Sequence, residues 1–324
     1  MKPGREDAKA FAREHLRGIW AATTTPFRDD LSLDEAGYAR NFAHWIDDLG
    51  IDGFFVSGKQ GEFFAMSVAE RKRTFEIAVE ACRGRGGTML SCSDQNLDTV
   101  LELARHARAV GGDYIVVHSP VLHFITDVDD TLYEYYRYIS EQVDIPIAMW
   151  SHPDAGYLMS PRLCARIAEL PNIVAIKYSV PRDLYAELTR LAGDRLIVST
   201  ASEAEWLDNV LELGWQVYLC STPPFLMQTA TDRRMREYTD LAFAGEAEAA
   251  RRVSASLQPV RDALHRTRPG GKPQAQQKYW QEMLGQAGGP VRRPQMQLTE
   301  TERAAIRAAF GGCGLGRPAT AKAS

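Results

Sequence analysis

A lysine at the end of an apolar stretch is the residue of this chain most suited to covalent chemistry. The four apolar residues from Ile173 to Ile176 precede Lys177 and predict a strand that is buried on both faces. Burial lowers the pKa of a lysine towards the range in which the neutral amine is a nucleophile. Neutral lysine amines attack carbonyl carbons and form Schiff bases. Alternatively, Lys177 only extends its ammonium group to water from the strand end.

The elements that must position this lysine form a regular alternation of strands and helices. Eight apolar stretches of strand length each precede a helical pattern. The expected strands are Gly18–Thr23, Gly53–Ser57, Thr88–Ser93, Asp113–His118, Ile145–Trp150, Ile173–Lys177, Arg195–Ser199 and Gln216–Cys220. Such alternation predicts a parallel sheet covered by helices. Eight units that close on themselves form a (β/α)₈ TIM barrel, the α/β fold that we expect here.

An open doubly wound sheet is the alternative, but no G-x-G-x-x-G fingerprint follows the first strand. We expect the barrel, with its catalytic strand ends, over residues 1–245 and a helical extension of the same domain over 246–313. A disordered tail is expected over 314–324, and no second domain is expected. The helices expected in the extension are Ala249–Thr267, Gln274–Leu284 and Glu300–Phe310.

Three serines mark expected helix starts in this alternation. Ser32, Ser67 and Ser202 are each followed three residues later by a glutamate. This spacing is typical of a capping box, in which the two side chains satisfy unpaired backbone N–H groups of the first helical turn. The sequence therefore predicts that helices begin just after these three residues.

Composition excludes several classes of protein. The chain has 324 residues, a formal net charge of −4 and 45% hydrophobic residues, which argues against a partner that is nucleic acid or a membrane surface. The N-terminal segment lacks the apolar region of a signal peptide, and no apolar run approaches the length of a membrane helix. The cysteines show no metal-ligand spacing, which predicts reduced thiols and a cytoplasmic location. They are Cys82, Cys92, Cys164, Cys220 and Cys313.

A (β/α)₈ barrel carries its active site at the carboxyl ends of the strands, so the residues at those ends are the candidates. Lys177 is the only lysine at a strand end proper, and Lys59 lies just inside the loop after the second strand. The other strand ends supply Thr23–Thr25, Ser57–Glu62, Ser91–Asp94, His118–Ser119, Trp150–His152, Ser199–Thr200 and Cys220–Thr222.

Several of these segments, in this order, resemble the motifs of the class I pyruvate-dependent aldolases, the family typified by dihydrodipicolinate synthase and N-acetylneuraminate lyase. Gly58–Glu62 is similar to the family's G-T/S-T-G-E loop, and Ile145–Pro153 is similar to its fifth strand. Ile173–Lys177 is similar to the sixth strand, which carries the Schiff-base lysine. Arg293–Leu315 is similar to the terminal helix. The resemblance covers roughly residues 17–315, consistent with a single domain.

The resemblance implies a Schiff-base lyase of the aldolase type that acts on pyruvate or another 2-oxo acid, with an aldehyde as the second substrate. Lys177 then forms the imine, the loop around residues 58–62 holds the carboxylate, and Trp150 shapes the pocket. No metal ion or organic cofactor is implied, because the lysine supplies the electron sink. A homo-oligomer, either a tetramer or a dimer, is also implied. We assign substrate binding to Gly58, Lys59, Gln60, Trp150, Thr200 and Tyr218.

Trp150 departs from the family pattern, in which a tyrosine at this position shuttles protons. An indole N–H is only a donor and does not titrate usefully, so another residue must act as the acid or base. His152 titrates near neutrality and is our first choice for this catalytic role, and His118 is the second. Tyr178 follows Lys177, but strand alternation directs it to the other face of the strand.

Further departures argue against dihydrodipicolinate synthase itself. The family's aromatic pair after the fourth strand is Val121–Leu122 here, and its arginine for a second carboxylate falls at Ala155. Ser151–Tyr157 instead resembles a loop of hydratase-aldolases that cleave aryl-substituted pyruvate adducts, and Phe124 with Trp150 would suit an apolar or aromatic substrate. The alternatives are a dehydratase or hydratase-aldolase that uses the same imine, or a non-catalytic barrel that binds a 2-oxo acid.

Overall fold

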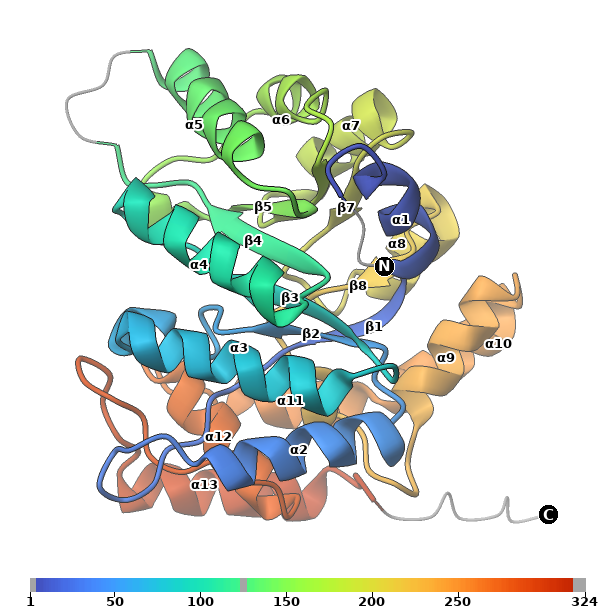
Figure 1. Cartoon of the computed structure of the whole chain (residues 1–324). Coiled ribbons are helices and arrows are strands. Elements are labelled where there is room, and N and C mark those ends of the chain that lie inside the picture. The colour runs from blue at the N-terminus through green and yellow to red at the C-terminus, as the bar shows by residue number, and fades with distance from the viewer. Residues whose placement is uncertain (1–3, 123–126, 317–324) are drawn as a thin grey trace.

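The chain folds as a barrel of eight parallel strands surrounded by helices (Figure 1). The computed structural model describes residues 4–122 and 127–316. The strand order is β7-β6-β5-β4-β3-β2-β1-β8, and a hydrogen bond from Ser221 N to Ala201 O (2.9 Å) joins the segments just beyond β7 and β8. The strands are β1 (Gly18–Ala22), β2 (Gly53–Val56), β3 (Gly87–Ser91), β4 (Tyr114–His118), β5 (Ile147–Ser151), β6 (Ile173–Tyr178), β7 (Ile197–Ser199) and β8 (Val217–Tyr218). The predicted (β/α)₈ fold is confirmed.

Seven helices alternate with the strands. They are α2 (Glu35–Asp47), α3 (Val68–Cys82), α4 (Leu97–Val110), α5 (Val128–Gln142), α6 (Pro161–Ile167), α7 (Arg182–Ala192) and α8 (Trp206–Leu213). Of the three predicted capping boxes, the one at Ser67 forms at the start of α3. The other two predictions were wrong, because Asp34 caps α2 in place of Ser32, and α8 begins at Trp206 without a side-chain cap from Ser202.

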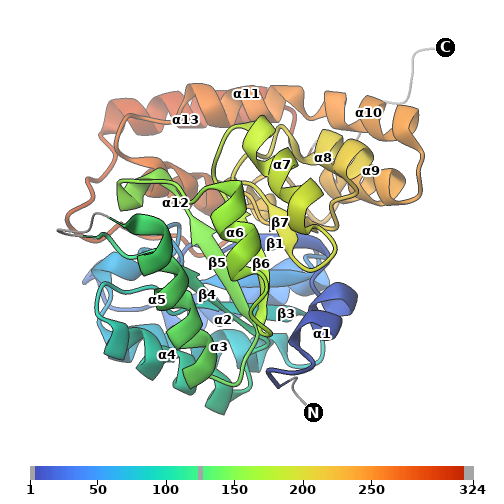
Figure 2. The same cartoon turned by 90° about the horizontal axis from the view of Figure 1, so that it is seen from above.

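Six helices lie outside this alternation. They are α1 (Ala8–His15), α9 (Arg234–Phe243), α10 (Ala247–Ser256), α11 (Gln258–Arg266), α12 (Pro273–Met283) and α13 (Glu300–Gly312). The predicted C-terminal helices are confirmed, but the helix expected over residues 249–267 is two helices that meet at Leu257. Pro259 stands in the first turn of α11, since proline is tolerated there and would break a helix interior. Figure 2 shows α10, α11 and α13 in a row on one flank of the barrel. Residues 317–324 of the predicted tail lie outside the described residues.

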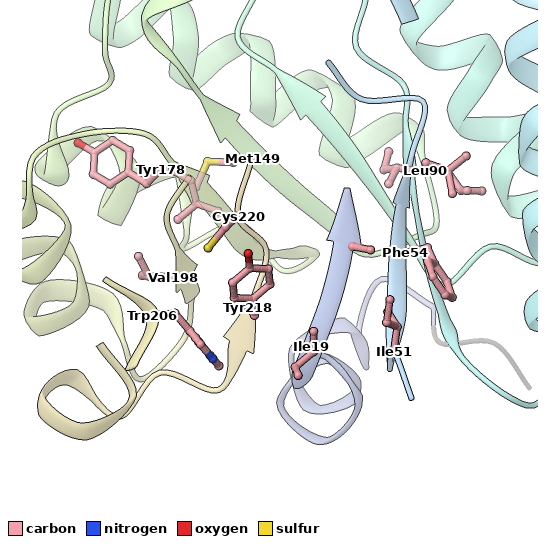
Figure 3. Packing of buried hydrophobic residues seen from close by; sticks show 14 of the residues in the cluster. Ile19, Ile51, Phe54, Leu90, Met149, Tyr178, Val198, Trp206, Tyr218 and Cys220 are labelled. Carbon is pink, nitrogen blue, oxygen red and sulfur yellow. The ribbon is translucent and has the colours of Figure 1, made fainter. Parts of the chain in front are cut away.

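Two separate apolar clusters form the core. The larger cluster lies between the strands and the helices, and Figure 3 shows Met149, Tyr178, Val198 and Tyr218 among its members. The smaller cluster fills the barrel interior and includes Trp20, Phe55, Met89, Tyr114, Val116, Ala148, Trp150, Ala175 and Leu219. Helix α1 belongs to this inner cluster through Ala8, Ala12 and Leu16, so it closes the end of the barrel opposite to the carboxyl ends of the strands.

A register shift in β6 decides which of its side chains face the barrel interior. Ile173 pairs with Ile147 and Ala175 pairs with Ala148, so Val174 is an extra residue on β6 at this point. Ile173 therefore belongs to the outer cluster, whereas Val174 and Ala175 belong to the inner one. Such a bulge re-aims the side chains that follow it. In β6 the bulge leaves the side chain of Lys177, two residues beyond Ala175, facing inwards.

The described part of the chain contains no helix that is long and apolar enough to cross a membrane. All five cysteines are buried and none forms a disulfide.

Candidate active site

Four side chains from neighbouring strands form one row at the carboxyl end of the barrel interior. The strand register pairs His118 with Trp150, Trp150 with Lys177, and Lys177 with Ser199. The residues two positions before them belong to the inner cluster, so strand alternation directs the row inwards as well. The fold therefore places the predicted nucleophile at the end of the barrel where active sites of this architecture lie.

Lys177 is buried, with 2% of its surface exposed. Its Nζ donates to the Cys220 carbonyl at 3.5 Å and lies 5.5 Å from the centroid of the Phe55 ring. Burial, together with the positive charge of Lys59, lowers the pKa of Lys177 to about 8, although Cys220 opposes the shift. A substantial fraction of the amine is therefore neutral and nucleophilic close to neutral pH.

The loop after β2 approaches this row closely. Gly58 lies against Phe55, and a Cβ at position 58 would stand 2.7 Å from that ring, so only glycine fits. Gln60 is buried, and its Nε2 donates to the Ser221 carbonyl at 3.2 Å. The Oε1 of Gln60 has no hydrogen-bond partner among the described residues. The structure thus brings Gly58 and Gln60, both predicted to bind substrate, to the mouth of the barrel.

Two charged residues connect the loops after β2 and β5. Lys59, from the first loop, forms an ion pair with the Asp154 carboxylate of the second loop. This bond holds the Lys59 ammonium at the rim, where a third of the side chain stays exposed. Because its charge is already paired, Lys59 adds less positive potential to the loop than an unpaired lysine would.

The two candidate histidines both lie close to Trp150. The ring centroid of His118 is 4.6 Å from that of Trp150, and the His152 centroid is 6.2 Å from it. Burial lowers the pKa of His118, and burial together with the Lys59 charge lowers the pKa of His152 to about 4. Both imidazoles are therefore neutral at neutral pH.

A cavity of about 320 Å³ opens beside this row. Trp150 and His118 form its inner wall, whereas Lys177 and His152 are not among its described lining residues. The remaining walls are largely apolar, with Phe63, Phe64, Pro120, Val121 and Ala155, and the polar lining comprises Lys59, Ser93, Asp94, Gln95, Ser119 and Asp154. The cavity therefore offers an apolar compartment on the far side of Trp150 from the lysine. Phe124, expected to contribute to such a pocket, lies outside the described residues.

Four of the six predicted substrate-binding residues, Gly58, Gln60, Thr200 and Tyr218, are not among the described residues that line this cavity. Tyr218 belongs to the outer cluster, where it packs against Trp206, and its hydroxyl donates to the Thr222 carbonyl at 2.6 Å. Thr200 is buried one residue beyond Ser199 and is absent from the described lining. Tyr178 also faces the outer cluster, as alternation predicted.

The sequence analysis missed two residues that the structure brings to the site. Phe55 lies in the strand before the glycine-containing loop, with its ring against both Trp150 and the Lys177 amine. Phe63 directly follows that loop and forms part of the cavity wall. The position of Phe55 two residues from the end of an alternating strand was the signal that could have identified it.

Among residues 4–122 and 127–316, no group of three or more His, Cys, Asp or Glu side chains is arranged to hold a metal ion.

The chain is similar over most of its length to known proteins. The dihydrodipicolinate synthetase family matches residues 15–311. The 4-hydroxy-tetrahydrodipicolinate synthase of Methanothrix thermoacetophila is 29% identical over 295 residues, which cover 90% of this chain and 95% of that protein. A Rhizobium meliloti protein named an uncharacterized DapA-like lyase is 30% identical over 293 residues, which cover 89% and 93%.

Solved structures agree with these sequence relatives on the fold. The dihydrodipicolinate synthase from Aquifex aeolicus is similar with a TM-score of 0.80 and 24% identity, over 92% of this chain and 98% of that chain. YagE from E. coli K12, solved in complex with pyruvate, is similar with a TM-score of 0.81 and 20% identity, over 92% and 99%. The site geometry and the family match together show that this chain belongs to the dihydrodipicolinate synthetase family.

Proposed function

We propose that this protein is a Schiff-base lyase of the aldolase type that acts on pyruvate or another 2-oxo acid. The observation that carries the proposal is the buried amine of Lys177, which lies at the carboxyl end of β6 and has a pKa lowered to about 8. Enzymes of the family to which the chain belongs use a lysine imine, and YagE, a structural relative, was solved with pyruvate. A dihydrodipicolinate synthase activity is not proposed, because Ala155 stands where that enzyme has an arginine.

The chemistry follows from the neutral amine. Its lone pair attacks C2 of the 2-oxo acid, and loss of water from the resulting carbinolamine leaves a protonated imine. The imine draws electrons from C3, so loss of a C3 proton gives an enamine. The enamine carbon then attacks an aldehyde, or the same steps run backwards and cleave the C3–C4 bond. Backbone N–H groups of the loop around Gly58 and Gln60 are suited to the carboxylate, since both residues lie at the mouth of the barrel.

The cavity favours a hydratase-aldolase as the second candidate. Its walls are mostly aromatic or aliphatic, and the charges of Lys59 and Asp154 at its rim neutralise each other. An apolar wall binds the aryl or alkyl group of an aldehyde by removing apolar surface from water. An aldehyde with an uncharged ring is therefore a better fit than one with a second carboxylate.

Reductive trapping tests the proposal. Borohydride with pyruvate should add one reduced adduct to the wild-type chain, detected by intact mass, and peptide mapping should place it on Lys177. The variant Lys177→Met should form no adduct. Lys72→Met is the matched control, because Lys72 lies on α3 and pairs with Glu102 at the surface, so this variant should react like wild type.

Two outcomes would overturn the proposal. An adduct that persists in Lys177→Met would assign the nucleophile to another residue. A wild-type chain that forms no adduct with pyruvate or longer 2-oxo acids would favour the non-catalytic barrel, which the presence of Trp150 in place of a tyrosine supports.

A further inference from the structure

We propose that His118 is the catalytic acid–base residue of this site and takes the place of the family's tyrosine. The inference rests on the proposed imine chemistry and concerns the group that moves protons to and from the substrate. It differs from the choice of His152 that the sequence alone favours.

The position of His118 suits this role. It belongs to the same inward-facing row as Lys177, two strands away, with Trp150 between them. Adjacent strands lie about 4.8 Å apart, so the two backbones are separated by roughly 10 Å. In a lysine adduct, the oxygen on C4 lies four bonds from Nζ, or roughly 5 Å when extended. The side chains converge inside the barrel, so an adduct that passes Trp150 brings this oxygen towards the His118 ring.

The hydrogen bonding of His118 leaves its second ring nitrogen basic. Its Nδ1 lies 2.6 Å from the backbone carbonyl of Ser119. A carbonyl oxygen can only accept, so Nδ1 carries the proton of the neutral ring and the lone pair is on Nε2. Burial and the charge of Lys59 lower the pKa of His118, while the Ser119 carbonyl and the Asp154 carboxylate oppose this shift. The ring is thus neutral and able to accept a proton at Nε2.

A second observation indicates that an oxygen atom of the substrate would find a hydrogen-bond donor in the cavity. The indole Nε1 of Trp150 is buried and has no acceptor among the described residues. The ring that carries it is perpendicular to His118, and both residues line the cavity. An unpaired buried donor is unfavourable, and a substrate oxygen placed in the cavity would relieve it. This donor and the Nε2 acceptor of His118 together suit a hydroxyl group, which accepts from the indole N–H and donates to Nε2.

His152 is less well placed. Its Nδ1 lies 3.2 Å from both the backbone N and the Oδ1 of Asp154, a residue of the loop after β5. His152 is not among the described residues that line the cavity, whereas His118 is. The structure therefore separates two histidines that the sequence treats as near equivalents.

The proposed step balances in both directions. In cleavage, the C4 hydroxyl proton passes to Nε2 of His118 and the oxygen electrons form the aldehyde C=O. The C3–C4 bond breaks, and its electron pair moves into the protonated imine and gives the enamine. The His118 imidazolium then returns the proton to C3, and water hydrolyses the imine to release pyruvate and the free lysine. Synthesis reverses these steps, with His118 first removing a C3 proton.

Exchange of the pyruvate methyl protons in D₂O isolates this step from imine formation. We expect wild type to exchange them, followed by NMR, and His118→Gln to exchange them about 10²–10⁴-fold more slowly. The borohydride adduct on Lys177 should form in both proteins, which shows that the variant is folded and still binds pyruvate. His106→Gln on α4 is the matched control, since its ring is partly buried beside Glu76 on a helix outside the barrel, and it should exchange like wild type.

Each remaining outcome has a defined meaning. No adduct on wild type would overturn the proposed function itself. If His118→Gln forms the adduct and exchanges the pyruvate methyl protons as fast as wild type, only the role of His118 is overturned. The same holds if wild type forms the adduct but exchanges no methyl protons. Loss of exchange in His152→Gln with normal exchange in His118→Gln would return the role to His152.

Discussion

At the scale of single residues, the nucleophilic character that we propose for Lys177 comes from its surroundings and not from a dedicated base. Its only hydrogen-bond partner among the described residues is the Cys220 carbonyl, and no carboxylate forms an ion pair with it. Desolvation therefore acts without the compensation that a nearby anion would give. The barrel interior thus shifts the equilibrium towards the neutral amine, because the ammonium form has neither water nor a counter-ion there.

The first prediction concerns the pH dependence of imine formation. Only the neutral amine attacks the carbonyl, so the initial rate of borohydride trapping with pyruvate should rise with pH through about 8, the lowered pKa of Lys177. Above that pH the rate should level off. A midpoint near 10.5, the ordinary pKa of lysine, would show that Lys177 is solvated in the folded protein.

The second prediction concerns the cost of burying this amine. The pKa of Lys177 is about 8 in the folded protein, which is below its value in the unfolded chain, so the fold disfavours the charged form. Below pH 8 the side chain is charged and its whole destabilising effect is present. One pKa unit corresponds to about 1.4 kcal/mol, so Lys177→Met should raise the free energy of unfolding by about 3 kcal/mol at pH 7. The gain should shrink as pH rises from 8 to 10.5, because the wild-type penalty disappears over that range.

Urea denaturation at pH 7 and pH 9.5 measures both parts of this prediction. A loss of stability in Lys177→Met at pH 7 would mean that packing of the methionine, and not desolvation of the amine, dominates.

At the scale of elements, one buried ion pair joins the C-terminal extension to the substrate loop. Lys278 of α12 donates to Glu62 Oε1 at 2.7 Å, and both side chains are fully buried. Glu62 ends the loop that contains Gly58 and Gln60, in a left-handed backbone conformation with φ of 58°. Its second oxygen accepts from the backbone N of Arg292 at 2.8 Å. The extension therefore helps to fix the loop that we propose for carboxylate binding.

The third prediction tests this connection. Lys278→Met leaves the Glu62 charge buried and unpaired, so it should lower the free energy of unfolding by about 3–5 kcal/mol. Glu62→Gln combined with Lys278→Met should cost less than Lys278→Met alone, because the isolated charge is gone. Lys72→Met, which breaks only a surface pair, should cost no more than about 1 kcal/mol. Urea titrations of the four proteins measure these differences, and equal costs for Lys278→Met and the double variant would contradict the argument.

At the scale of the whole molecule, the two ends of the barrel differ in structure: a helix closes one, and the candidate active site lies at the other. Helix α1 closes one end, where Phe11 packs against Tyr114 and Ala12 is buried in the inner cluster. The other end carries the lysine row, the loop after β2 and the cavity beside Trp150. One end is therefore closed by apolar packing, and the other carries the residues to which we assign the chemistry.

The fourth prediction concerns assembly. We propose, from the resemblance to the family, that the chain forms a homo-oligomer. Sedimentation at micromolar concentration should therefore give a species of two or four times 36.1 kDa. The expected mass should not depend on pyruvate, since Lys177 lies inside the barrel. A single species of 36.1 kDa at all concentrations would contradict the prediction.

The sequence by itself determined the fold and led to the prediction that Lys177 is the nucleophile. Strand and helix periods are local patterns, so eight alternating units sufficed to predict the barrel, and the apolar stretch before Lys177 marked a buried strand end. The predicted helix caps show that local sequence patterns are not always sufficient. Ser67 caps its helix as predicted, whereas Ser202 forms no cap for α8, and the adjacent Glu203 carboxylate binds Arg261 of α11 at 2.8 and 2.9 Å. A contact between residues so distant in sequence leaves no local pattern.

Only the tertiary structure decided which side chains meet. The stretch before Lys177 is apolar at every position, so its pattern could not say which face the lysine takes, and the extra residue Val174 in β6 settles that it faces inwards. Likewise, His118 and His152 look alike as sequence, yet strand register places only His118 in the row with Lys177. Register and cavity walls depend on pairing between distant segments, and this is why the choice of proton donor required the fold.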